Sequence, residues 1–343
     1  MIVRKIGLVG CGTVGSGLLE LLDRRAGYLA AKYGIGIKLV FATDTAKGTA
    51  FSKDGLDPRA LLDNLGEGGI DALYPGGPND LASLIGEGKP DILCEATPTN
   101  YATGEPGMSI MTAALSAGVS VVTSSKGALA LDMAGLKKLA AENGASLRFE
   151  SSVMSGTPLI NLARGPMAGC EITKIEGILN GTTNFILTKM ENGMDYTEAL
   201  AEATRLGYAE ADPAGDVEGF DAAVKVCILS AEIFGTPMRV GDVRRTGITG
   251  VTREDINRAA ASARKIKLVA GVKREDGSVM GYVSPEAVAK DDPLASVSDA
   301  ANAAKITTDN LGVVTIAGSG AGKIETAQGL LSDILDIALG FRI

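Results

Sequence analysis

The chain has 343 residues, of which 45% are hydrophobic, and its 33 Lys and Arg against 41 Asp and Glu give a formal charge of −8. This balance excludes a disordered or collagen-like chain, and the length predicts two domains or one large domain with an excursion. The acidity argues against a nucleic-acid-binding face. No apolar run approaches the roughly 20 residues that span a bilayer, and no signal-peptide layout is present. We therefore expect a cytoplasmic protein with small-molecule partners and no nucleic acid or membrane partner.

The sequence contains no histidine, which excludes Ser-His-Asp and Cys-His triads and histidine-ligated metals. Acid–base chemistry must then use Lys, Asp, Glu, Tyr or Cys. The four cysteines are scattered without a CxxC pair, so we expect buried free thiols in a reducing cytosol. They are Cys11, Cys94, Cys170 and Cys227.

The N-terminal segment carries a dinucleotide-binding pattern. An apolar strand at 3–9 leads into GCGTVG at 10–15, a helix continues to about residue 31, and a strand at 38–42 precedes Asp44. The order of strand, G-x-G-x-x-G, helix, strand and acidic residue is the fingerprint in its required context. The alternative is a glycine-rich turn without a ligand.

Each glycine of this pattern has its own expected role. Gly10 permits the tight turn, Gly12 lets a pyrophosphate approach the backbone and the helix N-terminus, and Gly15 lets helix and strand pack closely. Asp44 is expected to bind the ribose 2′-hydroxyl, which favours NAD, whereas Lys47 is placed to hold the 2′-phosphate of NADP. The choice between the two cofactors stays open.

Two further strands are expected at 91–96 and 119–123, with a helix at about 107–117 between them. The carboxyl ends of strands in such a sheet face the ligand crevice, so both strand ends should line the nicotinamide side. These ends carry Thr97, Pro98, Ser124, Ser125 and Lys126. The alternatives are an ordinary turn and a solvated loop lysine. A Gly- and Pro-rich stretch at 66–80 indicates a surface excursion.

The second half places polar groups beside predicted strands. A helix at about 133–143 is followed by strands at 146–151 and 171–179, and the polar run NGTTN begins at Asn180. A helix cap or turn is the ordinary interpretation of that run.

An acidic block then opens an apolar helix that runs to Phe234. Asp221 and Lys225 lie four residues apart and so share one helix face. The alternative is a solvated ion pair in a stripe with Glu232. However, a helix that is hydrophobic almost all round is buried, so we expect the pair in a cleft as an acid–base group. The block's acidic residues are Glu210, Asp212, Asp216, Glu218 and Asp221.

Six blocks of the sequence together resemble homoserine dehydrogenase. They are GLVGCGTVGSG, CEATPTN, VVTSSKGALA, ILNGTTNFIL, GYAEADPAGDVEGFDAAVKVCIL and AGSGAGKIETAQGLLSDI. The blocks occur in the family's order and span about residues 5–340. The resemblance implies NAD(P)-dependent interconversion of L-homoserine and L-aspartate 4-semialdehyde, on the route to threonine, methionine and isoleucine.

The resemblance also implies residue roles. Lys225 is the proton donor and acceptor, Asp221 holds it, and Lys126 contacts substrate and cofactor. The implied substrate-binding residues are Glu210, Lys126, Asp216 and Thr182. The implied cofactor-binding residues are Gly10, Gly12, Thr13, Val14, Gly15, Asp44, Thr97, Pro98, Ser124, Ser125, Lys126, Gly207 and Gly322.

The expected fold class is α/β, with a Rossmann-type domain at 1–147 completed by 318–343 and an α+β catalytic and dimerisation domain at 148–317. The family implies a homodimer in which the sheets of the second domain pair. It also implies a sodium ion held by Glu150, Val153, Ser155 and Thr157. We expect a short form without a fused aspartate kinase or a C-terminal ACT domain.

Three other functions remain open at this point. An amino-acid dehydrogenase acting on aspartate would share the glycine fingerprint but not the GTTN and acidic blocks. A non-catalytic NAD-binding protein would need neither Lys126 nor Lys225. A purely structural scaffold has no support beyond the fold.

Overall fold

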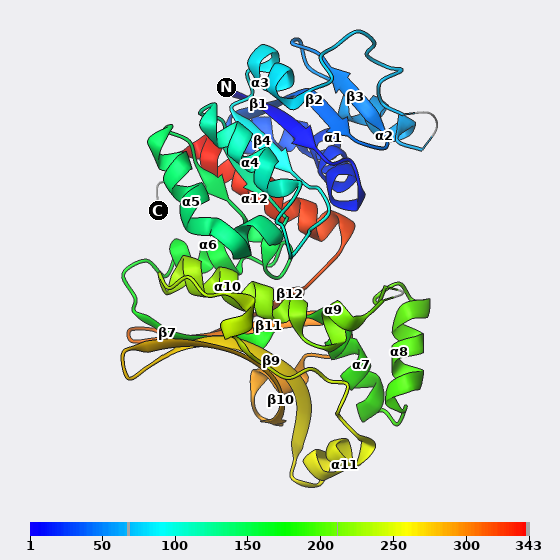
Figure 1. Cartoon of the computed structure of the whole chain (residues 1–343), viewed down its shortest axis with the longest axis vertical. Coiled ribbons are helices and arrows are strands. Elements are labelled where there is room, and N and C mark those ends of the chain that lie inside the picture. Colours follow the sequence, from blue (N-terminus) through cyan, green and yellow to red (C-terminus); the bar gives the residue numbers. More distant parts are fainter. Residues whose placement is uncertain (67–68, 211, 341–343) are drawn as a thin grey trace. The chain divides into compact units, whose positions relative to one another are not determined.

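The computed structural model describes residues 1–66, 69–210 and 212–340, and the chain divides into two compact units. The first unit consists of Met1–Gly156 with Gly322–Ile343, and the second of Thr157–Ala321 (Figure 1). The last three residues of the predicted first domain, 341–343, lie outside the described residues.

Within the described residues, the sheet of the first unit has the strand order β3-β2-β1-β4-β5-β6. Neighbouring strands are parallel except β3, which runs antiparallel to β2 at one edge. The strands are β1 Ile2–Val9, β2 Ile35–Asp44, β3 Gly48–Phe51, β4 Ile92–Glu95, β5 Ser120–Thr123 and β6 Leu147–Arg148. This arrangement confirms the predicted Rossmann-type α/β fold and adds β3, which the sequence analysis did not predict.

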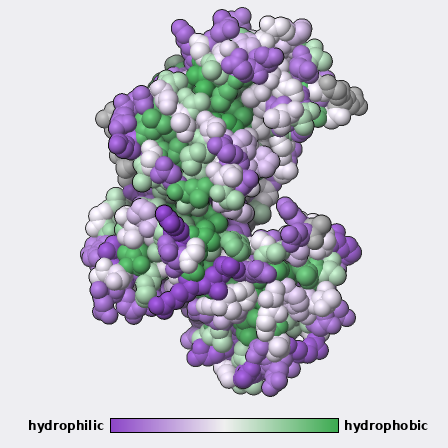
Figure 2. Space-filling view, viewed as in Figure 1, coloured by the Kyte–Doolittle hydropathy of each residue, from purple (hydrophilic) through white to green (hydrophobic). Residues whose placement is uncertain are grey.

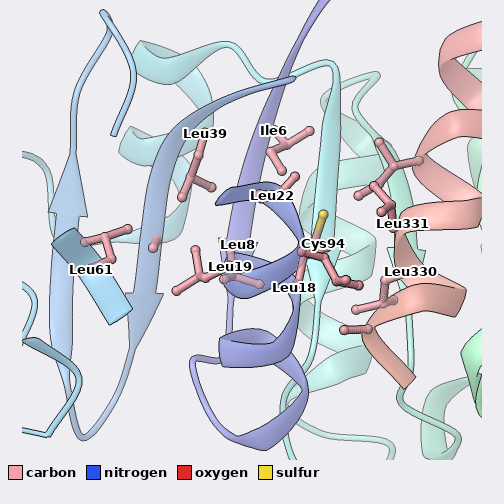
Figure 3. Close-up of a cluster of buried hydrophobic side chains, with 14 of the residues drawn as sticks. Ile6, Leu8, Leu18, Leu19, Leu22, Leu39, Leu61, Cys94, Leu330 and Leu331 are labelled. Atoms are coloured by element: carbon pink, nitrogen blue, oxygen red, sulfur yellow. The ribbon is translucent and has the colours of Figure 1, made fainter. Parts of the chain in front are cut away.

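Helices from both ends of the chain build the core of this unit. Leucines of α1 meet β1 on one side and Leu330 and Leu331 of α12 on the other (Figure 3). Burial of such side chains stabilises the unit by about 1.5–3 kcal/mol each. The helices are α1 Thr13–Tyr33, α2 Pro58–Asn64, α3 Leu81–Gly88, α4 Gly107–Ser116, α5 Gly127–Glu142 and α12 Lys323–Leu339. The C-terminal helix is therefore part of the first unit.

The segment after β6 differs from the predicted strand at 146–151. Only Leu147–Arg148 is extended, and a 3₁₀ turn follows at Glu150–Ser152. The Glu150 N–H donates to the Asp333 carboxylate at 2.8 Å, and the Ser151 hydroxyl donates to the Thr326 carbonyl at 2.8 Å. These bonds to α12 hold the segment on the first unit, which consequently extends to Gly156 and not only to the predicted residue 147.

The second unit is built on a mixed sheet with the order β12-β11-β7-β9-β10-β8. Neighbours are antiparallel except β8, which runs parallel to β10. Helix α10 lies along one face of this sheet (Figure 1). The strands are β7 Ile172–Ile178, β8 Arg244–Arg245, β9 Arg264–Glu275, β10 Ser278–Ala289, β11 Ala301–Thr308 and β12 Gly312–Ser319. The predicted α+β class of the second domain is confirmed.

The prediction that the acidic block opens a single helix is wrong, because α9 and α10 are separate helices. Glu210 and Asp212 precede Pro213, and α10 begins only after Gly219, whose φ of 78° is left-handed. Of the acidic block, only Asp221 lies in the first turn of α10. The helices are α6 Leu159–Arg164, α7 Gly181–Glu191, α8 Tyr196–Arg205, α9 Ala214–Val217, α10 Phe220–Ile233 and α11 Arg253–Ala261.

The surface in Figure 2 mixes hydrophilic and hydrophobic residues on the visible face. None of the helices in the described part of the chain is long and apolar enough to cross a membrane. The predicted excursion at 66–80 contains turns between α2 and α3, and its residues 67–68 lie outside the described residues.

Candidate active site

The turn between β1 and α1 has the geometry expected of a dinucleotide-binding loop. Gly10 has a φ of 93°, and an added Cβ there would lie 2.5 Å from the Ala96 carbonyl oxygen. An added Cβ at Gly15 would lie 1.9 Å from the Gly10 carbonyl oxygen, so both glycines are required by close packing. Gly12 is exposed, and an added Cβ would meet no atom within 4 Å. Open space beside the backbone at a helix N-terminus fits the approach of a pyrophosphate.

Asp44, at the end of β2, holds this loop in place. Its carboxylate accepts the N–H of Cys11 at 2.8 Å, of Ala46 at 2.9 Å and of Lys47 at 3.2 Å. Partial burial opposes its ionisation, but these donors and the Lys47 charge outweigh that effect and lower the pKa of Asp44. The Lys47 ammonium itself donates to the Cys11 carbonyl at 2.5 Å.

The ends of β4 and β5 carry the other predicted residues of the first unit. Thr97 and Pro98 follow β4, and Ser124 and Ser125 follow β5 directly. Lys126 is half-buried at the N-cap position of α5, so it is not a fully solvated loop lysine. A hydrogen bond joins the segments that follow the two strands: the Lys126 N–H, after β5, donates to the hydroxyl of Thr99, after β4, at 3.3 Å.

In the second unit, Lys225 and Asp221 form a buried ion pair on α10. Only 7% of Lys225 and 8% of Asp221 are exposed, so the solvated-stripe interpretation is wrong. The Lys225 Nζ lies 2.7 Å from Asp221 Oδ2 and donates to the Leu179 carbonyl at 2.6 Å. Glu232, the third member of that stripe, pairs instead with Arg164 at 3.1 Å.

Asn180 connects this pair to the rest of the acidic block, a role that the sequence analysis missed. Its Oδ1 caps α7 by accepting the Thr183 N–H at 2.9 Å, which agrees with the cap interpretation. Its Nδ2 donates to Asp216 Oδ1 at 2.7 Å and to Asp221 Oδ2 at 3.0 Å. One amide thus bonds two carboxylates, of which Asp221 pairs with the lysine.

The remaining predicted residues are placed as follows. Thr182 donates to the Tyr208 carbonyl at 2.7 Å, which joins the start of α7 to the segment that contains Gly207. Glu210 is exposed. In the first unit, Thr13 and Val14 begin α1, and Gly322 precedes α12 with a φ of 135°.

The four residues of the predicted sodium site are all buried. Glu150, Val153 and Ser155 belong to the first unit and Thr157 to the second. Met154 and Ser155 have consecutive left-handed φ values of 60° and 58°.

These features define a class of protein. The first unit carries a loop that fits a dinucleotide, and the second carries a buried lysine held by a carboxylate and a carbonyl, in a chain without histidine. Hydride transfer to or from a nicotinamide needs a partner group that moves a proton, so the class is a nicotinamide-dependent oxidoreductase.

Comparison with known proteins identifies the family. The model of the homoserine dehydrogenase NAD-binding domain matches residues 10–150, and the homoserine dehydrogenase model matches 158–335. The chain is 44% identical over 336 residues to the NAD(+)-dependent homoserine dehydrogenase of Pseudomonas canavaninivorans, covering 97% of this chain and 96% of that protein. The chain belongs to the homoserine dehydrogenase family.

Solved structures agree with this assignment. A crystal structure of a putative homoserine dehydrogenase from Archaeoglobus fulgidus has a TM-score of 0.86 at 38% identity and covers 98% of this chain and 99% of that one. A hyperthermophilic archaeal homoserine dehydrogenase in complex with NADPH has a TM-score of 0.85 at 32% identity, with 99% of each chain covered. Membership of this enzyme family argues against two of the alternative functions, the purely structural scaffold and the non-catalytic NAD-binding protein.

The glycine geometry yields a first prediction. Gly12→Val should weaken dinucleotide binding by at least about tenfold, because the branched side chain fills the space that a pyrophosphate would enter. The fold should persist, since nothing lies within 4 Å and the φ of −70° suits any residue. Calorimetric titration with NAD and a thermal melt measure the two effects.

Gly27→Val is the matched control, since Gly27 lies in α1, the helix that Gly12 precedes, and also has no atom within 4 Å of an added Cβ. It should leave NAD affinity unchanged. Unaltered affinity in Gly12→Val would mean that the pyrophosphate does not bind at this loop.

Proposed function

We propose that this chain interconverts L-homoserine and L-aspartate 4-semialdehyde with Lys225 as the group that gives and takes the proton. The observation that carries the proposal is the buried Lys225 ammonium, held by Asp221 and the Leu179 carbonyl. The reaction lies on the route to threonine and methionine that the family implies.

The proposed reaction moves a hydride and a proton. When bound, the nicotinamide supplies or accepts the hydride. In homoserine oxidation, the hydride leaves the carbon that bears the hydroxyl, and Lys225, in its neutral form, accepts the hydroxyl proton. In the reverse direction the ammonium returns this proton to the carbonyl oxygen. The family resemblance assigns substrate binding to Glu210, Asp216, Lys126 and Thr182, with the Glu210 carboxylate taking the substrate amine.

The wild-type protein should reduce NAD with homoserine and remain inactive with aspartate. Lys225→Met should keep the packing volume and lower kcat by roughly 10²- to 10⁴-fold, the usual contribution of general acid–base catalysis. Wild-type homoserine oxidation should accelerate towards alkaline pH, because Lys225 must be neutral to accept the proton. Steady-state kinetics across pH measure all three.

Lys267→Met is the control, because Lys267 is also a buried lysine of the second unit and pairs with Glu191 at 3.3 Å. Its kcat should match that of the wild type. Asp221→Ala should act through Lys225, so the double variant should cost much less than the summed single effects. Full activity in Lys225→Met would refute the mechanism, and activity on aspartate alone would refute the substrate.

We also infer a preference for NAD over NADP. The lowered pKa keeps Asp44 ionised at the end of β2, where the ribose 2′ position is bound in this fold. Lys47, the alternative phosphate ligand, already donates to the Cys11 carbonyl. The Asp44 carboxylate would therefore repel a 2′-phosphate, while the Lys47 ammonium is already engaged by a carbonyl.

Asp44→Asn should raise the ratio of kcat/KM with NADP to that with NAD by roughly tenfold. A charge pair at about 4 Å near a protein surface interacts by about 1–4 kcal/mol, and the amide removes this repulsion while its oxygen still accepts an N–H. Initial rates with both cofactors measure the ratio. An unchanged ratio would show that Asp44 does not set the preference.

We further propose a homodimer formed through the sheet of the second unit. Strand β12 is an edge strand on which exposed Val313, Thr315 and Ala317 alternate with half-buried residues. Val313 is 59% exposed and neighbouring Leu311 is 55% exposed. An edge of this kind readily pairs with another chain.

Val313→Asp should convert the dimer into monomers, because a charge would be buried unpaired at the interface. Light scattering coupled to gel filtration measures the mass against the 35.0 kDa of one chain. Tyr28→Asp, at a 47% exposed position of α1, is the control and should remain dimeric. A monomeric wild type, or a dimeric Val313→Asp, would exclude this interface.

Two smaller proposals complete the function. The four cysteines are unpaired, which supports a cytoplasmic location where thiols stay reduced. The oxygen donors of residues 150–157 support the sodium ion, and no catalytic step depends on it.

A further inference from the structure

Strand β4 ends in a carboxylate that is completely buried. Glu95 is 0% exposed, and burial raises the pKa of its carboxyl group against the opposing effect of its hydrogen-bond donors. Its Oε1 accepts the Thr97 N–H at 2.8 Å and also the Thr97 hydroxyl. Its Oε2 accepts the Thr123 hydroxyl from the end of β5. None of the functions assigned above uses this group.

These bonds tie together the two strand ends that carry predicted cofactor and substrate contacts. Glu95 and Thr123 are register partners in β4 and β5. The Thr123 hydroxyl oxygen also accepts the Ser125 N–H at 2.9 Å. The network continues through Thr99, which bonds the Ser125 hydroxyl at 3.3 Å and accepts the Lys126 N–H at 3.3 Å.

The carboxylate also determines which way the hydroxyl hydrogens point. Both threonines donate into Glu95, so their oxygen lone pairs are left as acceptors that face away from it. For Thr123 the acceptor role is visible in the bond from Ser125. Gly107, the first residue of α4, covers the carboxylate, since an added Cβ there would lie 3.6 Å from Glu95 Cδ and 3.4 Å from Ser125 Oγ.

We propose that Glu95 is a positioning residue, which fixes Thr97 and the segment 123–126 in the arrangement that binds the nicotinamide half of the cofactor. The inference rests on the proposed function, because the ends of β4 and β5 are assigned to the nicotinamide side. Glu95 acts through Thr97 and Thr123 and touches no reacting atom.

Glu95→Gln tests this role with almost no change in shape. The new amide must donate towards Thr123 Oγ1, which already accepts the Ser125 N–H, and the Thr123 hydroxyl hydrogen then loses its acceptor. Calorimetric titration of the full-length protein with NAD should give a dissociation constant raised about tenfold. Titration with ADP-ribose, which lacks the nicotinamide, should give the wild-type value.

A second pair of variants keeps the test decisive if Glu95→Gln does not fold. Thr123→Val removes the hydroxyl donor and should weaken the binding of NAD but not of ADP-ribose. Thr123→Ser retains a hydroxyl and should bind NAD as tightly as the wild type does. Ser120→Ala is the control, since Ser120 lies at the other end of β5, where its hydroxyl accepts the Ser146 N–H at 3.1 Å. It should bind both ligands normally.

Three results would overturn the proposal: unchanged NAD affinity in Glu95→Gln and Thr123→Val, equal weakening of NAD and ADP-ribose, or no restoration by Thr123→Ser. Binding is measured without turnover. Failure of the homoserine assay alone would therefore refute the proposed function and leave this result interpretable.

Discussion

The burial of the Lys225 ammonium is the constraint on which the site of the second unit depends. An ammonium group taken out of water costs several kcal/mol unless a charge and hydrogen bonds compensate. Asp221 provides the charge one helical turn earlier, and the Leu179 carbonyl provides an acceptor at the end of β7. Asn180 then links Asp221 to the start of α7, so that β7, α7 and α10 are fixed at one point.

The first unit uses carboxylates at strand ends in a related way. Asp44, the last residue of β2, accepts the Cys11 N–H of the glycine loop, and Glu95, the last residue of β4, accepts the Thr97 N–H of the segment that follows it. Asp44 is partly solvated and its pKa is lowered, so its negative charge can interact with a bound ligand. Glu95 is fully buried beside Gly107 of α4, and it accepts hydrogen bonds from Thr97 and Thr123, which fits the positioning role proposed for it.

Most of the fold could be predicted, because the signals were local. Strand β1, the glycine turn and helix α1 follow from apolar periodicity and from the fingerprint glycines, of which Gly10 and Gly15 are required by close packing. The errors arose where distant contacts decided the conformation. The end of the strand predicted at 146–151 forms a 3₁₀ turn instead, because Glu150 and Ser151 bond to α12. The acidic block is interrupted by Pro213 and Gly219 before α10 begins.

The sequence by itself determined the chemistry available to this protein. Without histidine, a lysine paired with an aspartate four residues away was the strongest acid–base candidate, and their spacing alone placed both on one helix face. The apolar surroundings of the pair in the sequence predicted its burial, which the structure confirms. Only the tertiary structure decided that Asn180 orients Asp221 from 41 residues away and that Glu95 joins Thr97 to Thr123. Local periodicity reports which face of an element is apolar, whereas hydrogen bonds between elements depend on how the whole chain packs.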